Sequence, residues 1–272
     1  TQSRSSAASD VYKRQIFNDG KNITVGAPYF NLVTVPIAFF LAFFQGYGVL
    51  TKWQESPLEL KPFLIILLFL FGLSIFFSYL IFNDLSLFNL AGIIMLSLIL
   101  AGVFLSSFRN FNKGKLFFNS FGMNLAHFGI AVTILGIGVV SSHSDSKEVI
   151  LDIGESVKLN NYEFTLLEED TRKESNFFSQ IAHFEVENLA SGKTFNLKPE
   201  KAFYPASKSV MTESAISINL KEDVYISLSE RLDTGEWIAK IQTKPFIRFI
   251  WLGAMLMTLG GVFAFTRRVL IR

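Results

Sequence analysis

The chain consists of long apolar runs and one long stretch in which apolar and polar residues alternate. An α-helix needs about 20 apolar residues to cross the hydrocarbon of a bilayer. Runs of that length predict transmembrane helices at residues 30–50, 62–82, 87–108 and 116–140, and a last one from residue 246. Such a series of apolar runs is typical of a protein that crosses the membrane several times.

Residues 142–245 have the pattern of a β domain instead. Their apolar residues recur at every second position, as in a strand with one buried face; Ala182, Phe184 and Val186 are one such set. We expect an antiparallel β sandwich or open barrel of about 100 residues, with residues 168–175 as an exposed loop. Hairpin turns are predicted at Asn160-Asn161, Ser191-Gly192 and Thr234-Gly235.

These patterns divide the chain into four parts. Residues 1–15 lack an apolar run and resemble translated adapter sequence, so we expect a non-native leader there. Residues 16–141 hold four transmembrane helices, residues 142–245 form the β domain, and residues 246–272 form the last helix and a tail. The expected fold is an α-helical polytopic membrane protein, with about five transmembrane helices and an inserted periplasmic antiparallel β domain.

Charge is distributed unevenly between these parts. The chain is 50% hydrophobic and 18% charged, with mean hydropathy +0.37. Residues 142–245 contain 18 of the 23 acidic and 12 of the 25 basic residues, a net charge of −6, whereas the rest carries +8. The sequence has no basic patch with interleaved aromatic residues, which argues against nucleic acid as a partner. It also has no Cys, which excludes disulfides and thiol chemistry within the chain.

The basic residues predict the orientation in the membrane. Lys52 and Lys61, Arg109 and its neighbours, and the C-terminal Arg267 and Arg268 all fall on one side if five helices alternate. Basic loops stay in the cytoplasm in most membrane proteins. We therefore expect a cytoplasmic C-terminus and a β domain outside the cytoplasm.

His127 is the residue that stands out chemically. It lies within the fourth apolar run, with Ser120 and Asn124 on the same helical flank at spacings of seven and three residues. An intramembrane His is a functional hypothesis by default, although a His that hydrogen-bonds between packed helices fits the pattern equally well. Beside this flank runs a small-residue stripe suited to a close neighbouring helix: Gly122, Ala126, Gly129, Thr133 and Gly136.

The remaining candidates favour structural interpretations. His183 is predicted on the polar face of a strand and His143 in a loop just outside the membrane, both in contact with solvent. Arg248, one turn into the last helix, is expected to extend its side chain to the membrane interface. The three His do not share a metal-ligand spacing, and no acid–base pair or nucleophile constellation is recognisable, so the sequence identifies no catalytic residue.

Five motifs, in order along the chain, resemble the C-terminal part of the CcmF family, the haem lyase component of bacterial cytochrome c maturation. The resemblance covers nearly all of residues 20–272. The motifs begin at Thr24 (TVGAPYFN), Gly122 (GMNLAHFG), Pro199 (PEK), Met211 (MTESAI) and Lys244 (KPFIRFIWLG).

The resemblance implies a multi-pass protein of the bacterial inner membrane that attaches haem to the thiols of an apocytochrome c CxxCH motif. It implies that His127 is an axial ligand of a membrane-embedded haem b, and that it binds the haem iron. The implied partners are a haem chaperone, apocytochrome c with its thiol-presenting maturation subunit, and membrane lipids.

The family's tryptophan-rich haem-handling segment has no counterpart among Trp53, Trp237 and Trp251, so we expect this piece to be inactive alone. Two alternatives remain open from the sequence. One is a non-enzymatic membrane-anchored assembly module of the maturation complex, in which His127 only packs. The other, less favoured, is a piece of an unrelated transporter.

Overall fold

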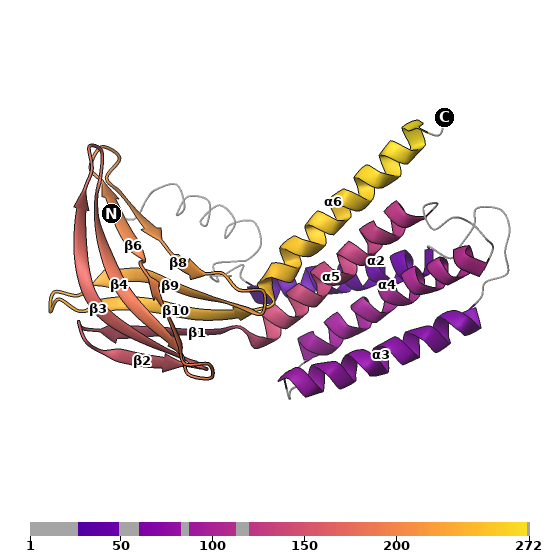
Figure 1. Ribbon diagram of the computed structural model, residues 1–272, viewed down its shortest axis with the longest axis horizontal. Coiled ribbons are helices and arrows are strands. Elements are labelled where there is room, and N and C mark those ends of the chain that lie inside the picture. Colours follow the sequence, from indigo (N-terminus) through magenta and orange to yellow (C-terminus); the bar gives the residue numbers. More distant parts are fainter. Residues whose placement is uncertain (1–26, 49–59, 83–86, 113–119, 271–272) are drawn as a thin grey trace, which may run out of the picture.

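The computed structural model describes residues 27–48, 60–82, 87–112 and 120–270. The expected leader at residues 1–15 therefore lies outside the described residues. Helices lie on one side of the molecule and a β domain on the other (Figure 1). The expected fold class, apolar helices with an inserted antiparallel β domain, is confirmed.

In the described ranges, five helices are long and apolar enough to cross a bilayer, which makes the chain a multi-pass membrane protein. Helix α2 continues through Pro36 without a break. The helices are α2 (Ala27–Gly48), α3 (Leu60–Phe82), α4 (Leu87–Asn112), α5 (Phe121–His143) and α6 (Ile247–Leu270).

Helix α4 lies between α2, α3 and α5. Its buried Leu98 and Ala101 pack with Phe63 of α3, while its Ile99 packs with Ala42 of α2 and with α5. Most of the side chains of α2, α3 and α6 are exposed in the single chain, as is usual for helices that face lipid or other helices.

Helices α5 and α6 pack closely through the small-residue stripe of α5. A Cβ atom added at Gly129 would lie 2.6 Å from the Gly253 carbonyl oxygen and 2.7 Å from the Met257 nitrogen. Gly122 and Gly136 would meet the α6 backbone in the same way. The close neighbour that the stripe predicts is therefore α6, within the same chain.

The β domain consists of two antiparallel sheets packed face to face. One sheet has the order β1-β10-β9-β8, and the other has the order β2-β3-β4-β6-β7 with β5 also paired to β4. The strands are β1 (Asp145–Leu151), β2 (Ser156–Leu159), β3 (Tyr162–Lys173), β4 (Phe178–Asn188), β5 (Lys193–Leu197), β6 (Glu200–Tyr204), β7 (Ser209–Glu213), β8 (Ala215–Ser217), β9 (Glu222–Arg231) and β10 (Trp237–Pro245).

Alternate residues of both sheets form the core of the β domain. Phe164 of β3 and Phe184 of β4 meet Trp237 of β10, and all three side chains are almost fully buried. Ala182 and Val186 are buried beside Phe184, as the two-residue period predicts. This shared core makes the two sheets a sandwich rather than two separate hairpins.

The three predicted hairpin turns are confirmed. Asn160, Gly192 and Gly235 all adopt positive φ angles of 52°, 66° and 103°, a region that Gly and Asn enter most readily. The loop predicted at residues 168–175 is wrong, because β3 extends to Lys173 and pairs with β4 along this length. The side chains in this part of β3 are mostly exposed and charged, so they show no alternation of apolar residues. The strand is held by its backbone pairing with β4.

The β domain is continuous with α5 and α6. Strand β1 follows α5 after one residue and β10 leads into α6, and the two strands pair with Asp145 opposite Thr243. Between β10 and α6, Phe246 adopts a positive φ of 55° and its N–H donates to the Lys221 carbonyl. The close helix pair thus becomes a close strand pair at this boundary.

The packing of α5 against α6 generates a prediction about Gly129→Ala. The added methyl group has no room against the α6 backbone, so we expect a loss of about 1–3 kcal/mol in stability, as for other overpacked sites. Thermal unfolding in bilayer nanodiscs measures it. Gly261→Ala on α6 is the matched control, because its new Cβ would meet nothing within 4 Å. Equal stability of the two variants would contradict the inferred seam.

Candidate functional site

His127 lies in the second turn of α5, close to the helix end remote from the β domain. The residues that precede this helix, 113–119, are outside the described part of the chain. Ala126 and Gly129 on either side of it face α6, which places His127 beside the closely packed seam. Its imidazole is partly exposed on the flank of the helix.

Among the described residues, one hydrogen bond orients the imidazole of His127. Its Nδ1 lies 2.7 Å from the backbone carbonyl oxygen of Met123, one turn earlier. A carbonyl only accepts hydrogen bonds, so Nδ1 carries the proton and donates it. In the neutral ring, Nε2 then carries the lone pair, which is the arrangement in which an imidazole binds a metal ion.

Polar side chains continue along the flank of His127. Asn124 Nδ2 donates to Ser107 Oγ of α4 over 2.8 Å and lies 3.5 Å from Ser120 Oγ. The Asn124 Oδ1 atom is buried without a partner among the described residues. Ser120 and Asn124 therefore do not hold the His127 ring N–H, which Met123 accepts. They leave one unsatisfied acceptor on the same flank.

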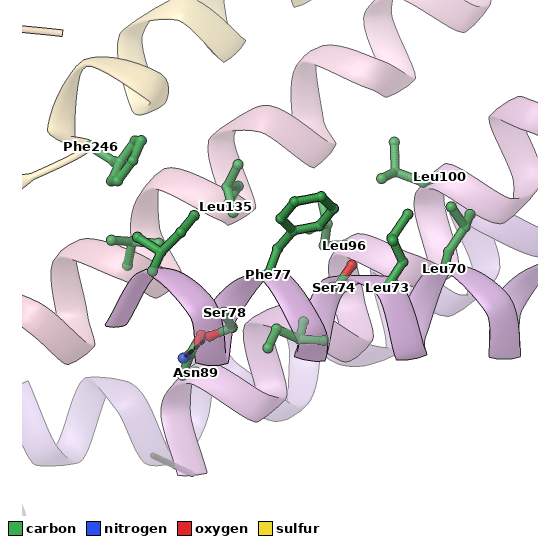
Figure 2. A pocket seen from close by; sticks show the side chains of 13 residues that line it. Leu70, Leu73, Ser74, Phe77, Ser78, Asn89, Leu96, Leu100, Leu135 and Phe246 are labelled. Atoms are coloured by element: carbon green, nitrogen blue, oxygen red, sulfur yellow. Dashed lines mark hydrogen bonds between the residues drawn. The ribbon is translucent and has the colours of Figure 1, made fainter. Parts of the chain in front are cut away.

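An apolar cavity of about 290 Å³ lies at the other end of the helices, between α3, α4 and α5 (Figure 2). Among the described residues, its polar lining consists of Ser74, Ser78 and Asn89. Asn89 Nδ2 donates to Ser78 Oγ over 2.7 Å. From α5 it takes Leu135 and Val139, about 12–18 Å along the helix from His127. The cavity and the His127 flank are therefore separate features.

The other two His residues lie outside this flank. His143 is the last residue of α5 and is partly buried, rather than in the loop that we expected. The His183 side chain is only 18% exposed, because Glu168 and Asp170 of β3 approach it, at 3.2 Å and 4.0 Å. In the described ranges no three His, Asp or Glu side chains gather as potential metal ligands.

Arg248 forms a buried ion pair at the base of the β domain. Its guanidinium lies 2.8 Å from Asp223 of β9, whose side chain is completely buried. Asp223 also accepts the Asn219 N–H at 2.9 Å, and the Tyr225 hydroxyl lies 3.4 Å from it. That Arg248 extends to the membrane interface stays a prediction. The structure adds the partner of its guanidinium, because the β9–β10 pairing brings Asp223 to the start of α6.

Two of the five sequence motifs, those that begin at Pro199 and Met211, come together on neighbouring strands. Glu200 pairs with Glu213 and Lys201 pairs with Thr212 in the β6–β7 hairpin. Arg172 contacts Glu200 at 2.7 Å, and Lys201 Nζ donates to the carbonyl of Ser229. The first contact lies within one sheet, between β3 and β6, whereas the bond from Lys201 reaches β9 of the other sheet. Lys201 therefore connects the two sheets.

A polar hollow of about 260 Å³ opens at the helix-proximal end of the sandwich. It lies between the β4–β5 turn and the start of β9. Burial raises the pKa of the Glu222 carboxyl, partly offset by a hydrogen bond from Tyr162. Burial, and then the charge of Glu222, raises the pKa of the Tyr162 hydroxyl. The hollow therefore favours a protonated Glu222 more than water does.

By its fold, the chain belongs to the class of polytopic membrane proteins, with a β sandwich inserted before the last described helix. Residues 142–245 match the family described as CcmF C-terminal beta-sandwich. Over about 90% of its length the chain resembles curated cytochrome c-type biogenesis proteins named CcmF. The chain belongs to the CcmF family and corresponds to its C-terminal portion.

Two relatives show the extent of the similarity. The CcmF protein of Pseudomonas aeruginosa is 33% identical over 258 residues, which are 90% of this chain and 38% of that protein. The CcmF protein of Escherichia coli K12 is 30% identical over 244 residues, 89% of this chain and 38% of that protein. The chain thus spans well under half the length of these relatives.

A solved structure titled "Cytochrome c Heme Lyase CcmF" has the same fold. It superposes with a TM-score of 0.73 at 20% sequence identity, over 88% of this chain and 40% of that chain.

The buried ion pair predicts a difference between single and double substitutions. Asp223→Asn leaves Arg248 without its counter-charge and should cost about 3 kcal/mol, the lower end for a broken buried pair because Arg248 is partly exposed. Adding Arg248→Gln should restore part of this loss. Thermal unfolding of the β-type circular dichroism signal measures both variants. A double variant less stable than Asp223→Asn would contradict the pairing.

The raised pKa of Glu222 predicts a pH-dependent effect of Glu222→Gln. A raised pKa means that the folded state holds the proton more tightly, so this stabilisation is complete below the ordinary Glu pKa of about 4.3. It is lost as the pH rises through the folded-state pKa. Glu222→Gln should therefore unfold at a higher temperature than the original chain at pH 7–8, with the gain fading near pH 4. Glu185→Gln, on an exposed site, is the control.

Proposed function

We propose that the chain is the C-terminal part of a cytochrome c haem lyase, in which His127 is an axial ligand of a haem b within the membrane. The observation that carries this proposal is the Nδ1–H bond from His127 to the Met123 carbonyl. It orients the ring and leaves Nε2 as the ligand atom, as in most metal-binding His residues. The name of the solved relative supports the same activity for the complete protein.

The residues of the flank fit a haem. His127 would be the residue of this chain that holds the haem iron, and no further ligand from this chain would be needed, because the macrocycle itself would supply four nitrogens. The unsatisfied Asn124 Oδ1 offers an acceptor beside the ring. When bound, the haem would supply the redox-active iron. This chain's residues would hold and orient it and exclude water through the α4–α5–α6 packing.

In this proposal the β domain, residues 142–245, lies in the periplasm and the C-terminus lies in the cytoplasm of the inner membrane. The domain would contact the haem chaperone, apocytochrome c and the thiol-presenting maturation subunit. Strand β7 is exposed at all five positions and ends one sheet, so its edge is open to pair with a partner strand.

The alternative is a non-enzymatic assembly module in which the β domain docks partner subunits and His127 only packs. The exposed edge strand β7 favours such docking. The geometry of His127 argues against a packing role, because the one hydrogen bond that its ring makes with described residues stays within its own helix.

The test is His127→Ala in the complete protein that contains this chain. We expect the low-spin haem spectrum to be lost, while the protein still folds, because Ala suits a helix and removes a polar group from the membrane. His127→Gly with added imidazole should restore the spectrum. Absorption of the purified, reduced protein measures the haem content.

His143→Ala and His183→Ala serve as matched controls and should keep the full haem content. Purified His127→Ala protein with an unchanged bis-imidazole spectrum would exclude His127 as the ligand and favour the assembly module.

A further inference from the structure

Exposed apolar side chains follow one another from β8, the edge strand of the sheet β1-β10-β9-β8, toward the helices. Ile216 of β8 is 43% exposed, and Ile218, just after the strand, is 68% exposed. Leu220, in the bend that leads into β9, is 66% exposed. These three apolar side chains, spaced two residues apart, are the apolar ridge. Lys221, also exposed, follows at its lower end.

The end of this ridge that is nearest to Lys221 lies beside the start of α6. The Phe246 N–H donates to the Lys221 carbonyl at 2.9 Å, and α6 starts at the next residue, Ile247. Strand β8 points toward this junction in Figure 1. Trp251, 65% exposed in the second turn of α6, marks the depth at which Trp side chains gather in membrane proteins, the membrane–water interface.

The segment at the junction is held in place rather than loosely attached. Asn219 donates its N–H to Asp223, which binds Arg248 of α6, and Asn219 Oδ1 accepts the Lys221 N–H at 3.2 Å. The backbone of residues 218–221 is thus tied to α6 on one side, while Ile218 and Leu220 remain outside the protein core.

We propose that residues 218–221 insert into the bilayer leaflet from which the β domain emerges. Ile218 and Leu220 would enter the boundary between headgroups and acyl chains, and Lys221 would lie among the lipid phosphates. The occupant of the ridge is thus membrane lipid. Exposure alone does not carry this inference, because Val210 and Met211 of β7 are similarly exposed. Those two residues lie on the preceding strand, toward the end of the domain away from α6.

The absence of Cys makes the test direct. Leu220→Cys and Ile218→Cys, each labelled with an environment-sensitive nitrobenzoxadiazole dye, are placed in nanodiscs of phosphatidylethanolamine and phosphatidylglycerol. We expect blue-shifted emission, loss of most of the fluorescence with a nitroxide on the lipid acyl chain, and protection from aqueous iodide. Circular dichroism confirms that the labelled chains are folded.

Met211→Cys and Val210→Cys, labelled in the same way, are the matched controls and should respond to iodide and not to the lipid nitroxide. A Leu220 label that behaves like the Met211 label would overturn the proposal. So would a blue-shifted Leu220 label that the lipid nitroxide does not quench, because protein rather than lipid would then cover the ridge.

Discussion

The close approach of α5 to α6 is the constraint on which the other features of the structure depend. Packed helices usually lie 8–10 Å apart, whereas paired strands lie about 4.8 Å apart. The chain passes from one spacing to the other at a single boundary, since α5 leads into β1 and β10 leads into α6. Glycines such as Gly129 and Gly253 remove the side chains that would hold the helices at ordinary distance. Strands β1 and β10 therefore continue from two helices that are already closely spaced.

The pair formed by Asp223 and Arg248 locks this boundary. A buried ion pair adds little net stability, because removing both charges from water offsets most of their attraction. The pair instead determines which segments lie next to each other, since an unpaired Asp223 in this completely buried site would be strongly unfavourable. The pair forms where β9 lies against the first turn of α6. It thus fixes the β domain relative to α6 more than it strengthens the fold.

Periodicity in the sequence predicts the helices, the main strands and their buried faces, because each depends on neighbours close in the chain. The strand at residues 168–173 was missed since its side chains are mostly solvated and only its backbone pairing holds it. The pairing of Asp223 with Arg248 was missed because it depends on the register of β9 with β10. His127 stood out by its type, but its proton position depends on a rotamer that residue order does not encode.

The position of His127 beside the contact between α5 and α6 restricts how its imidazole can move. Its neighbours Ala126 and Gly129 contact the α6 backbone, so the main chain at this point cannot shift without opening the close contact between α5 and α6. The bond to Met123 then restricts the ring itself. In the proposed haem site, an imidazole that is fixed in both backbone and side chain would need little reorganisation when it binds the iron. The glycines that bring the helices together therefore also hold the imidazole, and the same packing supports the β domain at the other end of α5.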